Sequence, residues 1–248
     1  METEEKLMKL NREANDDTSL VKFSRWVFLV LTILFILFFI SNKQLYLSLI
    51  QEDSAAEWLT FAFLIIAGVV SLVVALKIRR QYHYLHWFFW LFFAFNIFAG
   101  FEEISWGQRI FGMKTEGVFA KYSDQNEINL HNTLQGMAKV KTKHIAMYAL
   151  FVYGVILPWL ISKKKISGNW LARHHIIVPP IFLTSGFLIA TLFMIDVPTG
   201  NEEEVGELLY SLCFVLLMLH NLHLVNHSGV FEPEGLESRS KSTPSFKE

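Results

Sequence analysis

The densest group of reactive side chains lies at residues 102–109, which read Glu-Glu-Ile-Ser-Trp-Gly-Gln-Arg. Carboxylates, a hydroxyl, an amide and a guanidinium in so short a stretch could bind a cation, activate water or bind a polar substrate. If the stretch is helical, one face carries four of these side chains, those of Glu102, Ser105, Trp106 and Arg109. Glu103 then points about 100° away. A loop at Gly107 would change this assignment, so the choice between Glu102 and Glu103 stays open.

A second polar segment follows at residues 123–132, Ser-Asp-Gln-Asn-Glu-Ile-Asn-Leu-His-Asn. Glu127 and His131 are four residues apart, so both could ligate one cation if the segment is helical. A solvated helix face has the same pattern. The spacing therefore makes His131 a candidate ligand without deciding between the two interpretations.

Further carboxylates gather at the ends of apolar runs. Glu57 and Glu207 open two of these runs, whereas Glu102 and Glu103 close a third. A negative charge at a helix C-terminus is disfavoured by the helix dipole, so Glu102 and Glu103 need compensation. We expect a site for one metal ion, such as Zn²⁺ or Mn²⁺, formed by Glu57, Glu103, His131 and Glu207. The candidate catalytic residues of this site are Glu102, Glu103, Arg109 and His131.

A structural network is the main alternative to a metal site. In that arrangement Arg109 neutralises one of the glutamates. The other hydrogen bonds come from Ser105, Gln108 and Asn129. The same residues would then stabilise the fold and perform no chemistry.

Most of the nine histidines lie at the opposite ends of the apolar runs. His220, His223 and His227 form one helical stripe and could bind zinc together with His83 or His86. Alternatively, these side chains lie among lipid headgroups. Glu207 and His220 would be about 20 Å apart along one helix, so the acids and the histidines cannot share a cation.

The elements that position these residues are apolar helices. Of 248 residues, 52% are hydrophobic and only 18% are charged, whereas a soluble domain has about 25% charged residues. Runs of about 17 to 25 apolar residues can cross a membrane as helices, and a barrel would show alternating segments instead. Six runs are long enough, at about residues 23–41, 57–76, 84–101, 144–162, 176–195 and 205–225. The sequence predicts an all-α membrane bundle with six transmembrane helices.

The distribution of basic residues predicts the topology. Most of the 22 Lys and Arg residues lie on one side if both termini are cytoplasmic, which places the acids on the outer side. We divide the chain into a polar tail at 1–22, a six-helix domain at 23–227 and a disordered cytoplasmic tail at 228–248. A long outer loop at 112–143 carries the His131 segment.

Several function classes are disfavoured. A net charge of −1 gives no nucleic-acid footprint. The lone Cys213 lies in an apolar run and cannot form an internal disulfide. The sequence has no catalytic triad or nucleotide-binding motif, which argues against covalent and ATP-driven mechanisms. It carries no signal for an oligomeric state.

Two motifs resemble a group of bacterial multi-pass membrane proteins of uncharacterised function. They are AGFEEISWGQRIFG at 99–112 and NEINLHN at 126–132, preceded by EDSAAEW at 52–58. The resemblance implies a bacterial cytoplasmic membrane location. It also implies importance for Glu57, Glu103, Trp106, Gln108, Arg109 and His131. A looser analogy to alkaline ceramidases rests on residue types alone, because the expected Ser and Asp partners on early spans are missing.

Three functions follow from these observations. The first is a metal-assisted hydrolase or transferase acting on a lipid or cell-envelope substrate, with one Glu as general base and His131 or a second Glu as ligand. The second is a carrier for a small ion or solute, since Pro158 and the Pro179-Pro180 pair permit broken helices. The third is a non-catalytic scaffold in which Arg109 and the acids form a structural network.

Overall fold

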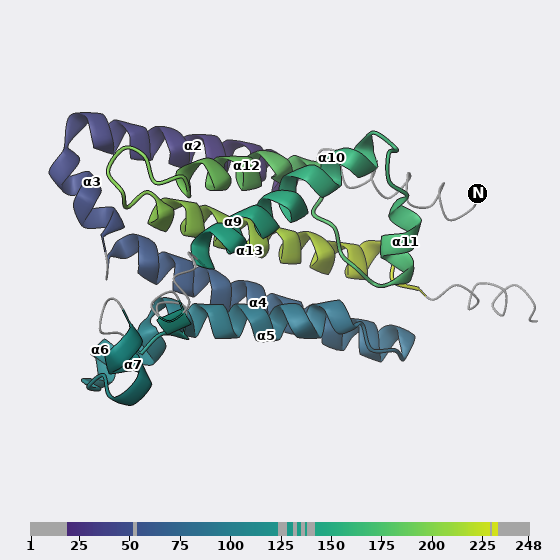
Figure 1. Ribbon diagram of the computed structural model, residues 1–248. Helices are drawn as coiled ribbons and strands as arrows, with labels where there is room; N and C mark the ends of the chain where they lie inside the picture. Colours follow the sequence, from purple (N-terminus) through teal and green to yellow (C-terminus); the bar gives the residue numbers. More distant parts are fainter. Residues whose placement is uncertain are drawn as a thin grey trace, which may run out of the picture.

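The computed structural model describes residues 19–51, 54–123, 128–130, 133–134, 137, 142–228 and 230–232. All regular elements in these ranges are helices (Figure 1). The α-helices are α2 (Ser19–Ser41), α3 (Lys43–Ile50), α4 (Ala55–Tyr82), α5 (Trp87–Glu103), α6 (Gln108–Phe111), α7 (Gly117–Tyr122), α9 (Thr142–Phe151), α10 (Leu157–Ser162), α11 (Gly168–Arg173), α12 (Thr184–Phe193) and α13 (Glu203–His227). The 3₁₀ and π turns are η1 (Ser105–Gly107), η2 (Val152–Ile156) and η3 (Ile181–Leu183).

Four of the helical stretches are long and apolar enough to cross a membrane. They are α2, the stretch from α3 through α4, the stretch from α9 through α10, and α13. A fifth is counted if α5 and the Ser105–Phe111 segment, which are bent by 64° relative to each other, form one span. The structure therefore has the helices of a membrane protein, and the sixth crossing stays a prediction.

The fifth predicted run, at 176–195, forms a shorter helix than expected. Its helical part spans only Ile181–Phe193. Pro180 has extended backbone angles, φ −65° and ψ 151°, and a proline disfavours helix in the residue before it, here Pro179. The proline pair therefore delays the start of the helix.

Helix α13 lies in the middle of the bundle and packs against α4 and α12 (Figure 1). In its most apolar window of 18 residues, 78% of the residues are buried, against 17% for α2. Helix α2 keeps large apolar side chains such as Trp26, Ile33 and Ile40 on its outer face. This contrast is typical of a membrane bundle, in which peripheral helices face lipid.

Small residues bring several helices into close contact. A Cβ atom added to Gly154 in η2 would lie 2.1 Å from Cγ of Phe187. A Cβ atom on Gly186 would lie 2.5 Å from the ring of Phe28. Glycine at these positions lets aromatic rings of neighbouring helices fill the space beside the backbone, as in other membrane helix interfaces.

The two ends of the bundle differ in charge. Helices α3, α6 and α7 and the loop between α12 and α13 lie at one end, whereas α2 starts and α13 finishes at the other (Figure 1). We call the first the acidic end, defined by Glu57, Glu103, Glu202 and Glu207. The second is the histidine end, defined by His86 and His220.

Candidate functional site

The chain turns sharply after Glu103, where α5 ends. Ser105, Trp106 and Gly107 have positive φ angles of 46°, 56° and 75°. The segment therefore does not continue as one regular helix. The two adjacent carboxylates of Glu102 and Glu103 consequently have different neighbours.

Glu102 binds the loop that follows α7. Its side chain is 9% exposed and accepts hydrogen bonds from Trp106 Nε1 at 2.5 Å and from the backbone N of Leu130 at 2.8 Å. Asn129 Nδ2 donates to the backbone O of Glu102 at 3.2 Å. One carboxylate thus joins the first sequence motif to the second.

Gln108 makes a second connection of the same kind. Its Oε1 accepts from the backbone N of Ile128 at 2.6 Å, and its Nε2 donates to Thr115 Oγ1 at 2.8 Å. We call this group the loop lock, formed by Glu102, Trp106, Gln108 and Asn129. Gln108 and Asn129 thus form hydrogen bonds to the backbone at both ends of the loop, as expected for the structural network proposed from the sequence. The carboxylate of Glu102 itself accepts hydrogen bonds from Trp106 Nε1 and the backbone N of Leu130.

Replacing Glu102 by Ala should loosen the loop lock. Removing the carboxylate leaves Trp106 Nε1 and the Leu130 amide without their acceptor, and hydrogen bonds to charged groups contribute about 1.5 to 3 kcal/mol each. We expect a loss of about 2 to 4 kcal/mol in the free energy of unfolding. Faster proteolysis at residues 112–143 should accompany it. Thermal unfolding and limited trypsin digestion measure the two effects.

Glu116→Ala is the matched control, because Glu116 is an exposed acid in the same segment. Its unfolding free energy should stay within about 0.5 kcal/mol of the wild type. Equal digestion of the Glu102→Ala variant and the wild type would contradict the assigned role of the lock.

Glu103 and Glu207 lie among other acids between α4, α5 and α13. Glu103 interacts electrostatically with Glu57, Glu102 and Glu204. Glu207 interacts with Glu103, Glu57 and Glu203, and with Lys143 as a basic neighbour. Among the described residues, none donates a hydrogen bond to the carboxylate of Glu103 or Glu207. We call Glu57, Glu103, Glu204 and Glu207 the carboxylate cluster.

Lys143 at the start of α9 is held by two other acids. Its Nζ lies 2.8 Å from Asp196 Oδ2 and also binds Glu203 Oε2. Asp196 in turn accepts from the backbone N of Glu203 at 3.1 Å. The lysine thus connects α9 to the loop before α13. It forms ion pairs with Asp196 and Glu203, and it acts on the more distant Glu207 only through its electrostatic field.

Glu202 is the centre of a separate hydrogen-bond network that the sequence did not predict. It is 1% exposed and accepts hydrogen bonds from Tyr46 OH and from the N and Oγ1 of Thr199. The backbone N of Gly200 donates to it as well, at 3.0 Å. Burial opposes ionisation of this carboxyl, but the hydrogen bonds from Thr199, Gly200 and Tyr46 outweigh burial and lower the pKa of Glu202. The first of three consecutive Glu residues at the start of a helix gives no local sign of these partners.

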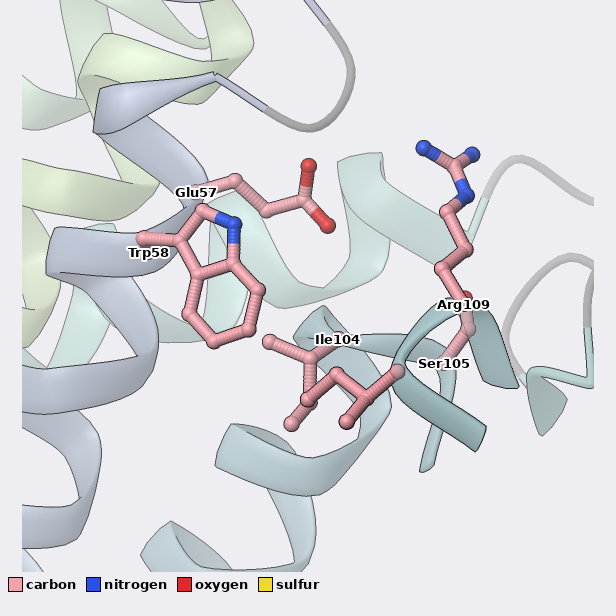
Figure 2. Close-up of a pocket in the computed structure, with 6 residues that line it drawn as sticks. Glu57, Trp58, Ile104, Ser105 and Arg109 are labelled. Carbon is pink, nitrogen blue, oxygen red and sulfur yellow. The ribbon is translucent and has the colours of Figure 1, made fainter. Parts of the chain in front are cut away.

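A small cleft lies between α4 and the α5–α6 turn. Glu57 and Arg109 stand on its two sides and Ser105 forms part of its wall (Figure 2). Its volume of about 20 Å³ leaves room for about one water molecule. Opposite charges therefore flank a small cleft.

No group of three or more His, Cys, Asp or Glu with the geometry to hold a metal ion occurs within the described ranges. Of the four predicted ligands, the structure brings Glu57, Glu103 and Glu207 into one electrostatic neighbourhood. The fourth, His131, and its partner Glu127 lie outside the described residues. The Zn²⁺ or Mn²⁺ site therefore remains a prediction.

The histidines at the histidine end have different neighbours and do not form the predicted zinc site within the described residues. His220 is 7% exposed and packs against Phe182, whereas His223 and His227 stack on each other at the surface. His86 is buried, with its ring 4.9 Å from that of His175. Burial and, to a lesser extent, the charge of His175 lower the pKa of His86 to about 4. His86 is thus a neutral core residue near pH 7, and exposed His83 lies apart from it.

We compared the chain with family models, curated proteins and solved structures. None of them matches. The similarity of the two sequence motifs to a bacterial membrane protein group therefore remains a prediction. The function has to be argued from the carboxylate cluster and its surroundings.

Proposed function

We propose that this protein is a small-ion carrier that takes up protons at its carboxylate cluster. We further propose that the bundle lies in the cytoplasmic membrane of a bacterium, with six crossings and the acidic end on the outer side. The pair Glu103 and Glu207, which face other acids and receive no hydrogen bond from a described residue, carries this proposal.

The charges around this pair favour uptake of a cation. Within the described part of the chain, the electrostatic neighbours of Glu103 are the acids Glu57, Glu102 and Glu204. The basic neighbour of Glu207 is Lys143, which already binds Asp196 and Glu203. Like charges at the boundary of an apolar layer repel each other and are expensive to desolvate. A proton relieves the repulsion by binding one carboxylate oxygen, without the coordination geometry that a metal ion needs.

Polar atoms continue from the cluster into the interface between α4 and α5. Thr60 lies one turn after Glu57 on α4, and Asn96 lies two turns before Glu103 on α5. Both residues are at most 1% exposed, and Thr60 Oγ1 and Asn96 Oδ1 have no hydrogen-bond partner among the residues that the structure describes. Unsatisfied polar atoms are costly in an apolar layer, so water or a passing ion is favoured beside them. This supports an ion path along α4 and α5.

Metal-assisted hydrolysis of a lipid or envelope substrate has less support. Glu57, Ser105 and Arg109 are the residue types that such an enzyme would use, and they line one cleft. The cleft has room for about one water molecule, and the described residues hold no group with the geometry of a metal site. We therefore place ion uptake ahead of hydrolysis.

Proton uptake by proteoliposomes tests the proposal. The purified protein is reconstituted with a pH-sensitive dye inside the vesicles, and a potassium diffusion potential drives uptake. We expect Glu103→Gln and Glu207→Gln each to lower the initial rate about tenfold or more, because each substitution removes a proton-binding carboxylate with little change in shape. Glu116→Gln should transport like the wild type, since Glu116 lies outside the cluster.

Two outcomes would overturn the carrier proposal. One is a wild-type rate no higher than that of empty vesicles. The other is a stoichiometric Zn²⁺ or Mn²⁺ ion that the wild type retains and that both Glu103→Gln and His131→Ala lose, with unchanged proton uptake. Thermal unfolding of each variant separates a loss of transport from a loss of fold.

A further inference from the structure

The segment from α6 to α7 exposes an unusual amount of apolar surface. Phe111 is 75% exposed, Ile110 60% and Val118 56%, and Met113 between them is 40% exposed. We call the segment at 108–122 the foot. A group of large apolar side chains of this kind marks a contact with a membrane or a protein rather than with water.

The direction of the foot places it beside the bundle. The chain bends by 64° between α5 and the Ser105–Phe111 segment. In Figure 1, α6 and α7 lie next to the end of α5, on the side away from α2 and α12. If α5 crosses the membrane, a segment bent this strongly runs closer to the membrane plane than to the axis of α5. The foot therefore extends over the lipid next to α5.

The apolar surface of the foot continues that of α5. Trp106 stacks on Phe101 with ring centroids 5.7 Å apart and meets Phe98 edge-on at the same distance. Phe98 and Phe101 are exposed on α5, on the surface that faces lipid if α5 spans the membrane. Trp is typical of the boundary between headgroups and acyl chains. Trp106 thus links the lipid-facing surface of α5 to the foot without a polar gap.

Basic residues alternate with the apolar ones in the foot. Arg109 precedes Ile110, Lys114 follows Met113, and the Nζ of Lys121 in α7 lies 4.8 Å from the ring centroid of Tyr122. Glu116 is the one acid in this stretch of sequence. Basic side chains interspersed with large apolar ones are the composition of segments that lie in the interface of anionic lipids.

We propose that the foot is an interfacial segment that inserts into the headgroup region of the lipid leaflet at the acidic end. Phe111, Ile110 and Val118 contact the upper part of the acyl chains, and Lys114 and Lys121 contact phosphate groups of anionic phospholipids. The inference does not depend on proton uptake. In this arrangement residues 108–122 contact lipid instead of lying in water outside the membrane.

Fluorescence quenching in nanodiscs tests this placement. Phe111→Cys and Val118→Cys are labelled with an environment-sensitive dye; buried Cys213 is protected from the reagent. We expect nitroxide groups near the top of the acyl chains to quench both labels about twofold or more beyond a label at Asn201→Cys. Asn201 is exposed at the same end of the bundle, in the loop before α13, and its label should be quenched mainly by aqueous iodide.

The contacts of Lys114 and Lys121 with anionic headgroups are tested separately, by changing the lipid composition. In nanodiscs with phosphatidylglycerol, the lipid quenching of the Phe111→Cys label should exceed that in pure phosphatidylcholine. Lys114→Gln combined with Lys121→Gln should remove this difference, because the two substitutions delete the cations that attract the anionic headgroups. Labels at 111 and 118 that iodide quenches as strongly as the label at 201 would overturn the proposal and indicate a foot in water, available to a protein partner.

Discussion

Replacing Glu202 by Ala is expected to lower the free energy of unfolding by about 3 to 5 kcal/mol, one of the two largest effects of a single substitution in this chain. Glu202 is 1% exposed and joins Tyr46 on α3 to Thr199 and Gly200 before α13. The substitution leaves the buried Tyr46 hydroxyl and the donors of the partly exposed Thr199–Gly200 turn without their acceptor. Equilibrium unfolding in detergent micelles at pH 7 measures the loss.

Two variants calibrate this result. Asn201→Ala changes the exposed preceding residue and should stay within about 0.5 kcal/mol of the wild type. Tyr46→Phe removes one of the donors and should lower the unfolding free energy by about 1 to 2 kcal/mol. If Glu202→Ala cost no more than Tyr46→Phe, the Thr199 and Gly200 contacts would contribute nothing to stability.

The effect of Glu202 should depend on pH in a defined direction. Its pKa in the folded protein lies below the usual value, because the hydrogen bonds to the carboxylate outweigh the opposing effect of burial. A group with a lowered folded pKa stabilises the fold fully above its unfolded pKa, about 4.3 for Glu, and loses this contribution as the pH falls through the folded value. The difference between wild type and Glu202→Ala should therefore shrink below about pH 4.

Gly154→Ala is expected to destabilise the bundle by about 3 kcal/mol, at the upper end of what an added methyl group does in a packed core. The new Cβ would lie 2.1 Å from Cγ and 2.2 Å from Cδ1 of Phe187. Phe187 is fully buried in α12, so its ring cannot swing into solvent. Thermal unfolding, with helix content followed by circular dichroism, measures the loss.

Gly168→Ala is the matched control for this glycine. A Cβ at Gly168 in α11 would meet Cγ2 of Ile161 at 3.8 Å, an ordinary contact. Because Ala favours a helix over Gly, this variant should be neutral or slightly stabilised. Combining Gly154→Ala with Phe187→Leu should restore part of the lost stability by making room. Without any recovery, the clash with Phe187 is not the cause.

The helices could be predicted well from the sequence, because each apolar run is a local feature. The ends of the runs at 144–162 and 205–225 differ by two residues at most from the helical stretches Thr142–Ser162 and Glu203–His227. The run at 176–195 was predicted too long, although Pro179 and Pro180 within it are a local signal against a helix. A count of apolar residues ignores the backbone restriction of proline, so it placed the start of this helix at residue 176 instead of Ile181.

The candidate site was harder to predict, because it depends on contacts between distant residues. Gly107 signals a turn, but Ser105 and Trp106 also adopt positive φ, which residues with a Cβ rarely do. That turn decides which of Glu102 and Glu103 binds the loop. Glu202 resembles the acids that follow it, and its partner Tyr46 lies 156 residues earlier in the chain. No local pattern relates two such residues.

The central position of α13 has a consequence for biosynthesis. Within the described residues it follows the other long helices, yet it is the partner against which α4 and α12 pack. Membrane helices insert first and associate afterwards. The earlier helices therefore lie in the bilayer with their inner faces uncovered until α13 has inserted. A ribosome that stops before residue 203 would leave an inserted but unassembled chain, a substrate for membrane quality control.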